Sequence, residues 1–178
     1  MRKSLCQPAF GLILAILSVP FLSAQTTPRE LIVNQSGKGF ALSVSGKSAP
    51  IYVSSEDFPG VILACRDLQT DIGRVTDAVP ELVTGNLPQA KQAVIAGTLG
   101  KSTVIDRLVK DGKIDAKGIA GQWETYRIQV VNKPFPGIGE ALVILGSDKR
   151  GTIYGIYELS GAMGVSPWHW WADVPIEH

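Results

Sequence analysis

The side chains with the clearest chemical potential gather in the segment SPWHWWADVP (166–175). Three of the four tryptophans of the chain, Trp168, Trp170 and Trp171, lie there, followed by Asp173. Flat indole rings offer a large contact area at low conformational cost, so clustered tryptophans are typical of sugar-stacking surfaces and of interfaces. We therefore predict contact with a saccharide or with another domain. Burial of these rings as structural aromatics is the alternative.

A second candidate site is the segment LGSDKRGTIYG (145–155), in which Asp148, Lys149 and Arg150 stand between an apolar strand and a helix. Ligands of open α/β sheets gather at the carboxyl ends of strands. Two cations at the start of a helix oppose the helix dipole, which favours an anionic partner such as a carboxylate on a substrate or on another domain. The equally weighted alternative is a solvated turn in which Asp148 caps the helix.

The segment AGTLGKS (96–102) also follows a strand and opens a helix, so its amides could hold an anion. It lacks the spacing of a phosphate-binding loop, because only two residues separate Gly97 from Gly100. We predict a tight strand-to-helix turn here. Beyond these segments there is no G-x-S-x-G, no H-E-x-x-H and no cysteine cluster, and no carboxylate pair stands out. The sequence thus predicts no catalytic residue, no metal ligand and no cofactor.

Alternating strand and helix patterns must position these residues. Strand patterns occupy segments at 40–44, 51–53, 92–100, 123–131 and 140–148, with a turn at 45–50. Helix patterns occupy 54–77, 101–113 and 149–164. The almost wholly apolar run 140–148 indicates a central strand. The order β-β-α-β-α-β-β-α predicts an α/β fold, an α+β sandwich of helices against a mostly buried mixed sheet.

Residue spacing predicts which helix faces are buried. In the first helix the inward residues recur at helical spacing: Val61, Cys65, Leu68 and Ile72. Ser54 or Ser55 is the predicted cap of this helix. In the last helix we expect an inward face made of Ile153, Ile156, Tyr157 and Ser160.

The N-terminus has the pattern of a secretory signal peptide at 1–24. Arg2 and Lys3 precede an apolar run from Phe10 to Leu22, and small residues then favour cleavage after Ala24. The run has about 13 residues, fewer than the roughly 20 of a membrane span, so a single-pass anchor is the less favoured alternative. We expect a secreted or periplasmic protein with no membrane attachment after cleavage. A leader (25–39), an α/β domain (40–164) and a junction (165–178) would follow.

Charge and cysteine content argue against a nucleic-acid-binding protein and against a disulfide-stabilised protein. The chain has 17 Lys and Arg against 16 Asp and Glu, and loss of Arg2 and Lys3 would leave 15 against 16. Such a balance gives no electrostatic support for nucleic-acid binding. Only Cys65 would remain after cleavage, so no internal disulfide is expected, and its apolar surroundings predict a buried side chain.

Three segments carry a resemblance to a known family: GTLGKSTVIDRL (97–108), GQWETYRIQVV (121–131) and ALVILGSDKRGTIYGIYELSGAMGVSPWHWWADVP (141–175). They resemble the N-terminal region of glycoside hydrolase family 115, the xylan α-1,2-glucuronidases. The resemblance extends from about Ile51 to Pro175 and leaves out the segment before Phe40.

The resemblance implies a small accessory domain like those that precede the barrel in hexosaminidases. It also implies a secreted enzyme that removes 4-O-methyl-glucuronic acid from glucuronoxylan or a related polysaccharide by an inverting mechanism, with two carboxyl groups as acid and base. The catalytic residues would lie on a following TIM barrel of about 250 residues, and the full-length protein would form homodimers.

No position of this chain corresponds to the catalytic residues of the family. We therefore expect an inactive N-terminal fragment whose partner is the missing barrel, with Trp168, Trp170 and Asp173 contacting sugar or barrel. For Lys149 and Arg150 the resemblance suggests contact with the uronate carboxylate or with the barrel. A stand-alone carbohydrate-binding domain and an exported structural domain are the alternatives.

Overall fold

The computed structural model describes residues 39–165, and a five-stranded mixed sheet forms its centre. The strands lie in the order β4-β3-β5-β7-β6. Their bounds are Ile51–Val53 (β3), Leu82–Val83 (β4), Ala90–Thr98 (β5), Tyr126–Asn132 (β6) and Ile138–Gly146 (β7). The first four strands in this order are parallel, and β6 runs antiparallel to β7. The parallel strands therefore end at one side of the sheet, which we call the carboxyl edge.

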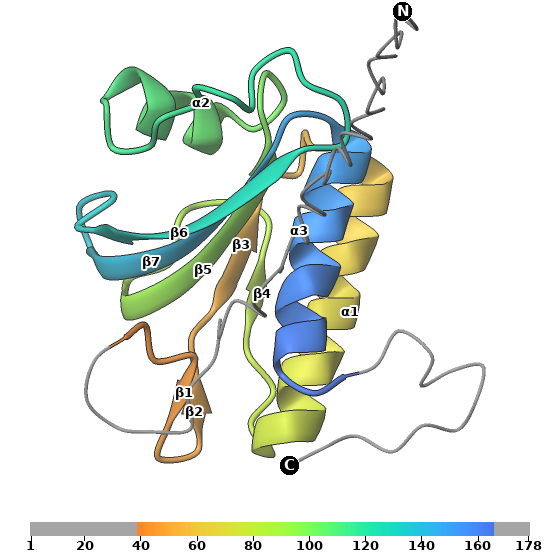
Figure 1. The fold of residues 1–178 in the computed structure, drawn as a ribbon. Helices are drawn as coiled ribbons and strands as arrows, with labels where there is room; N and C mark the ends of the chain where they lie inside the picture. The colour runs from red at the N-terminus through yellow and green to blue at the C-terminus, as the bar shows by residue number, and fades with distance from the viewer. Residues whose placement is uncertain (1–38, 166–178) are drawn as a thin grey trace, which may run out of the picture.

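Helices cover both faces of this sheet. Helices α1 (Pro59–Thr76) and α3 (Lys149–Ala162) lie side by side on one face, and α2 (Thr103–Lys110) lies on the other (Figure 1). Separate apolar clusters fill the two layers, and in β7 the six residues from Ala141 to Gly146 are all buried. A strand covered on both faces needs such a continuous apolar run. The predicted fold class, an α+β sandwich of helices on a mixed sheet, is confirmed.

Helical periodicity predicted the buried face of α1 correctly. Val61, Cys65, Leu68 and Ile72 are all fully buried against the sheet. The central position of β7, between β5 and β6, is also as predicted.

The start of α1 was predicted wrongly. The helix begins at Pro59, its N-cap residue is Phe58, and no side chain caps it. Proline disfavours helical backbone in the residue before it, so the helix cannot continue upstream through Phe58. Ser54 instead accepts a hydrogen bond from the Glu56 amide at 3.2 Å.

Two further sequence predictions need correction. The segment predicted as one strand and a turn folds into a hairpin of β1 (Ser43–Val44) and β2 (Lys47–Ser48). Its turn residues Ser45 and Gly46 both have positive φ, as tight hairpin turns require. The short strand β4 was not predicted, because two residues carry no periodicity.

Tyr157 does not face the core as predicted but is 44% exposed on α3. Its hydroxyl donates a 2.6 Å hydrogen bond to Asp67 Oδ2 on α1. Partial burial, together with this bond, raises the pKa of Tyr157 to about 12. The side chain thus joins the two helices at their surface.

The predicted signal peptide (1–24), the leader (25–39) except Gly39, and the junction (165–178) except Val165 lie outside the described residues. Within 39–165, no helix combines the length and the apolar character that crossing a membrane requires.

Two glycines of the α3 region test how tightly this helix packs. Gly146 leaves no room for a methyl group, because the backbone nitrogen of Thr152 lies against it, whereas the corresponding space at Gly161 is empty. We expect Gly146→Ala to lower the free energy of unfolding by about 2–3 kcal/mol. Gly161→Ala should raise it by about 0.5 kcal/mol, since alanine favours helix. Urea denaturation followed by circular dichroism measures both, and equal effects would contradict the packing.

Candidate functional site

A buried polar network joins the strands at the carboxyl edge. Asp57, which follows β3, is 4% exposed, and Thr98 at the end of β5 and Thr152 in α3 are buried as well. Asp57 accepts hydrogen bonds from the Thr98 amide and hydroxyl, both at 2.8 Å, and from the Phe58 amide at 2.8 Å. The Thr98 and Thr152 hydroxyls lie 2.8 Å apart. Both oxygens of the buried carboxylate are therefore bonded, as a group sealed from water requires.

Asp148 is the N-cap of α3, so the helix-cap alternative is confirmed for this residue. Its Oδ1 accepts from the Gly151 amide at 2.8 Å, and its Oδ2 accepts from the Glu124 amide at 2.9 Å. These backbone hydrogen bonds, first that of Glu124 and then that of Gly151, lower the pKa of Asp148. The carboxylate fixes both the start of α3 and the turn before β6.

Arg150 has its anionic partner inside the chain. Its Nη1 lies 2.8 Å from Glu124 Oε1, and its Nη2 donates to the Tyr154 hydroxyl at 2.9 Å. The bond to Tyr154, followed by the charge of Glu124, raises the pKa of Arg150. Lys149 is exposed and forms no ion pair within residues 39–165. The structure thus brings Asp148 and Arg150 together around Glu124, and Lys149 does not take part in this group.

The turn at 123–125 is the part of this site that the sequence did not predict. Trp123 was expected to begin a strand, but β6 starts at Tyr126 and Trp123 is 86% exposed. Glu124 has a φ of 52°, an unusual backbone region for a side chain of this size. The only sequence signal was an aromatic residue beside a charge at the start of a strand pattern.

The segment 96–102 forms the tight turn that was predicted. Its amides are bonded internally: Leu99 donates to the Gly146 carbonyl at 3.0 Å, and Gly100 donates to Asp106 Oδ1 at 2.8 Å. Lys101 and Ser102 both donate to the Thr98 carbonyl. No amide of this group is left to hold an anion.

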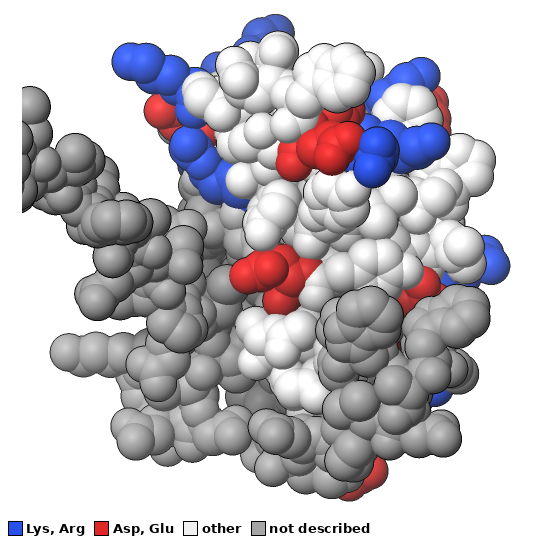
Figure 2. Space-filling view, turned by 45° about the vertical axis from the view of Figure 1, so that its right-hand side comes forward, with Lys and Arg blue, Asp and Glu red and all other residues white. Residues whose placement is uncertain are grey.

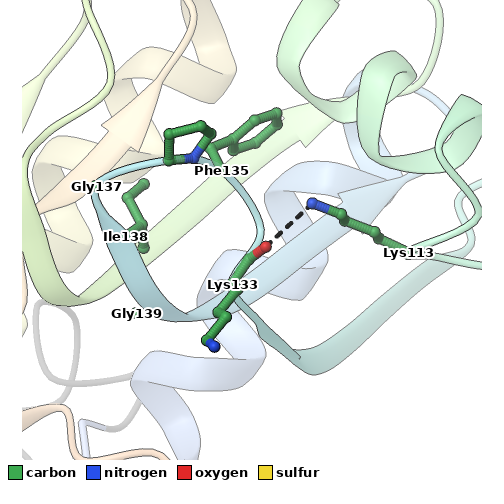
Figure 3. Close-up of a pocket in the computed structure, with 7 residues that line it drawn as sticks. Lys113, Lys133, Phe135, Gly137, Ile138 and Gly139 are labelled. Atoms are coloured by element: carbon green, nitrogen blue, oxygen red, sulfur yellow. Dashed lines mark hydrogen bonds between the residues drawn. The ribbon is translucent and has the colours of Figure 1, made fainter.

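A pocket lies at the opposite end of β7 (Figure 3). It has a volume of about 500 Å³ and is lined by Lys113, Lys133 and the segment 135–139. The Lys113 ammonium donates to the carbonyls of Lys133 at 3.0 Å and Pro134 at 2.6 Å, so it holds the loop before β7. No carboxylate, hydroxyl or thiol side chain that could perform acid–base or nucleophilic chemistry lines this pocket.

Within residues 39–165, potential metal ligands and Cys65 are the further groups that could carry chemistry. No group of three or more His, Cys, Asp or Glu side chains in this range could hold a metal ion. Cys65 is buried, and burial, aided by the charge of Asp57, raises its pKa to about 12. A thiol of that pKa stays protonated and unreactive near neutral pH.

The predicted contact residues Trp168, Trp170, Trp171 and Asp173 lie outside the described residues. Their predicted contacts with sugar or with another domain stay predictions. Asp148, Lys149 and Arg150 are placed by the structure, but no ligand or domain contact of theirs is tested by it.

Comparison with solved structures gives one informative neighbour. It is a family GH115 4-O-methyl-α-glucuronidase, BtGH115A, with specificity for decorated arabinogalactans. The TM-score is 0.60 and the sequence identity is 33%, over 75% of this chain and 16% of that chain. This chain therefore has a fold like that of a domain in a glycoside hydrolase of family 115, and it spans about one sixth of that enzyme.

A second structure, CpGH84D, matches with a TM-score of 0.45 and 12% identity over 72% of this chain and 20% of that chain. At this level the match carries no argument. No protein-family profile and no curated protein matches the sequence.

The lowered pKa of Asp148 makes its cap dependent on pH. A carboxyl whose pKa is lower in the folded state adds stability above its unfolded pKa of about 3.9, and this is lost as pH falls through the folded pKa. We expect Asp148→Ala to lower the free energy of unfolding by about 1 kcal/mol at pH 7. The difference from wild type should shrink below about pH 4, as measured by urea denaturation.

Ser102→Ala is the matched control, because Ser102 caps α2 with a hydroxyl that does not titrate. Its effect should be the same at pH 7 and at pH 3. An Asp148→Ala effect that stays constant over this range would contradict the role assigned to the carboxylate.

Proposed function

We propose that this chain is the N-terminal accessory domain of an exported glycoside hydrolase that releases 4-O-methyl-glucuronic acid from plant polysaccharide side chains. One observation carries the proposal: 33% identity and a TM-score of 0.60 to a 4-O-methyl-α-glucuronidase over three quarters of the chain. A likeness of that kind over most of a domain supports common descent. Because the match spans 16% of that enzyme, the activity of the whole enzyme is proposed for the protein that carries this domain.

The described side chains support an accessory role rather than a catalytic one. An inverting glycosidase needs one carboxyl group that can be protonated and a second that can activate water. At the carboxyl edge Asp57 has both oxygens engaged, and Asp148 accepts a backbone hydrogen bond on each oxygen. Glu124 is held by Arg150. Each of these carboxylates has a structural task, so we place the acid and the base on a separate catalytic barrel.

The carboxyl edge and the segment after α3 are the proposed contacts with that barrel and its substrate. Lys149 and Arg150 stand exposed at the start of α3, and the tryptophan segment follows the same helix in the sequence. We propose that Trp168, Trp170, Trp171 and Asp173 form the junction. The substrate class is a polysaccharide with glucuronic acid side chains, such as glucuronoxylan or a decorated arabinogalactan.

The proposal predicts that the purified 178-residue chain releases no methylglucuronic acid from glucuronoxylan or arabinogalactan. The polypeptide that carries this domain in its source, isolated with an antibody against residues 39–165, should release it. Chromatography of the released uronic acid measures both. Release by the purified chain would contradict the accessory role, and an inactive native polypeptide would contradict the function.

A further inference from the structure

The backbone of the turn that carries Trp123 is held by several hydrogen bonds. Thr125 donates from its amide to the Ser147 hydroxyl at 3.1 Å, and the Ser147 amide donates to the Thr125 carbonyl at 2.8 Å. The Thr125 hydroxyl donates to the Trp123 carbonyl at 2.9 Å. With the hydrogen bond from Glu124 to Asp148, the turn 123–125 is fixed to the start of α3.

Glu124 adopts a positive φ, a backbone strain that persists only when surrounding contacts hold it. The result is an indole 86% exposed to solvent, the most exposed large apolar side chain of residues 39–165. The hydrogen bonds hold the backbone that carries this indole. Such pre-ordering of a backbone lowers the cost of binding a partner.

The neighbours of Trp123 indicate the chemistry of that partner. Glu124 forms an ion pair with Arg150. The Arg150 guanidinium has five N–H donors, so donors remain after its contacts with Glu124 and Tyr154. Tyr154 is 40% exposed and lies beneath Arg150, with 5.8 Å from the guanidinium carbon to the ring centre. Lys149 and Lys101, which follow β7 and β5, form no ion pair within residues 39–165, and the Lys101 ammonium lies over the Phe58 ring at 5.2 Å. Figure 2 shows basic and acidic side chains side by side at the upper end of the molecule.

We propose that Trp123 and Arg150 form a surface site for a carboxylate-bearing polysaccharide, one pyranose ring stacking on the indole and a nearby carboxylate facing Arg150. A flat indole fits the C–H face of a sugar ring, and a guanidinium is suited to carboxylates. This inference rests on the proposed function and deepens it, because it gives the accessory domain its own contact with the acidic substrate. The site differs from the tryptophan segment after α3.

Affinity electrophoresis of the 178-residue chain in glucuronoxylan gels tests the site. We expect retardation of the wild-type chain, and Trp123→Ala should weaken the apparent affinity by at least about tenfold, as removal of a central anchor does. Trp123→Phe should keep part of the affinity because it keeps a flat ring. Arg150→Gln should weaken binding and reduce its dependence on salt.

Val79→Ala is the matched control, since Val79 is 70% exposed but follows α1 at the opposite side of the sheet from the carboxyl edge. It should bind as wild type does. Circular dichroism and the urea midpoint should be unchanged in Trp123→Ala, because so exposed a side chain contributes little packing.

Three results would overturn the site. The first is retardation that Trp123→Ala leaves unchanged, which would place binding elsewhere, for example in the tryptophan segment. The second is equal retardation in gels of a neutral polysaccharide, which would remove the role of the carboxylate. The third is no retardation, which would indicate that Trp123 contacts another protein surface and not a polysaccharide. Activity of the native polypeptide would survive each of them, so this site and the proposed function fail separately.

Discussion

The buried carboxylate of Asp57 is the constraint on which the carboxyl edge depends. A polar group removed from water is tolerated only when it is hydrogen bonded, and here Thr98 and Phe58 supply donors to the two oxygens. The requirement fixes the end of β5 against the exit of β3. Because the Thr98 hydroxyl also contacts Thr152, α3 is tied to the same point. A single buried group thus sets the relative positions of two strands and two helices.

From this point the hydrogen bonds continue outward to the surface. The Thr152 hydroxyl donates to the Asp148 carbonyl at 2.9 Å, and the Asp148 side chain accepts from Glu124 at the start of the exposed turn. Gly151 must be a glycine, because the Thr125 carbonyl occupies the space of a side chain. The turn that carries Trp123 is therefore connected to the core by a chain of polar contacts. Its rigidity comes from the interior of the domain.

Local patterns in the sequence were sufficient to find the three helices and the central strand, but they missed the start of α1 and the exposure of Tyr157, and they were insufficient for this network. The inward face of α1 repeats every three or four residues, and the Asp148 cap acts on Gly151 three residues later. Both are visible in a short window of sequence. Asp57 and Thr98, which bond to each other, are 41 residues apart in the sequence. Glu124 and Asp148, which also bond to each other, are 24 residues apart. Nothing local marks such pairs, so the turn at 123–125 could not be predicted.

The cations at the start of α3 show why a pattern can be correct and its explanation incomplete. Two positive residues there oppose the helix dipole, and an anionic partner on a substrate or another domain was one of two equally weighted interpretations. The structure supplies Glu124 for Arg150 and lets Asp148 satisfy the first amides of the helix. The electrostatic cost is thus met within the domain, because the ion pair holds the guanidinium against the residue that follows Trp123. The exposed indole and the guanidinium are therefore linked through Glu124. This link through one residue is the basis on which we propose a shared ligand site.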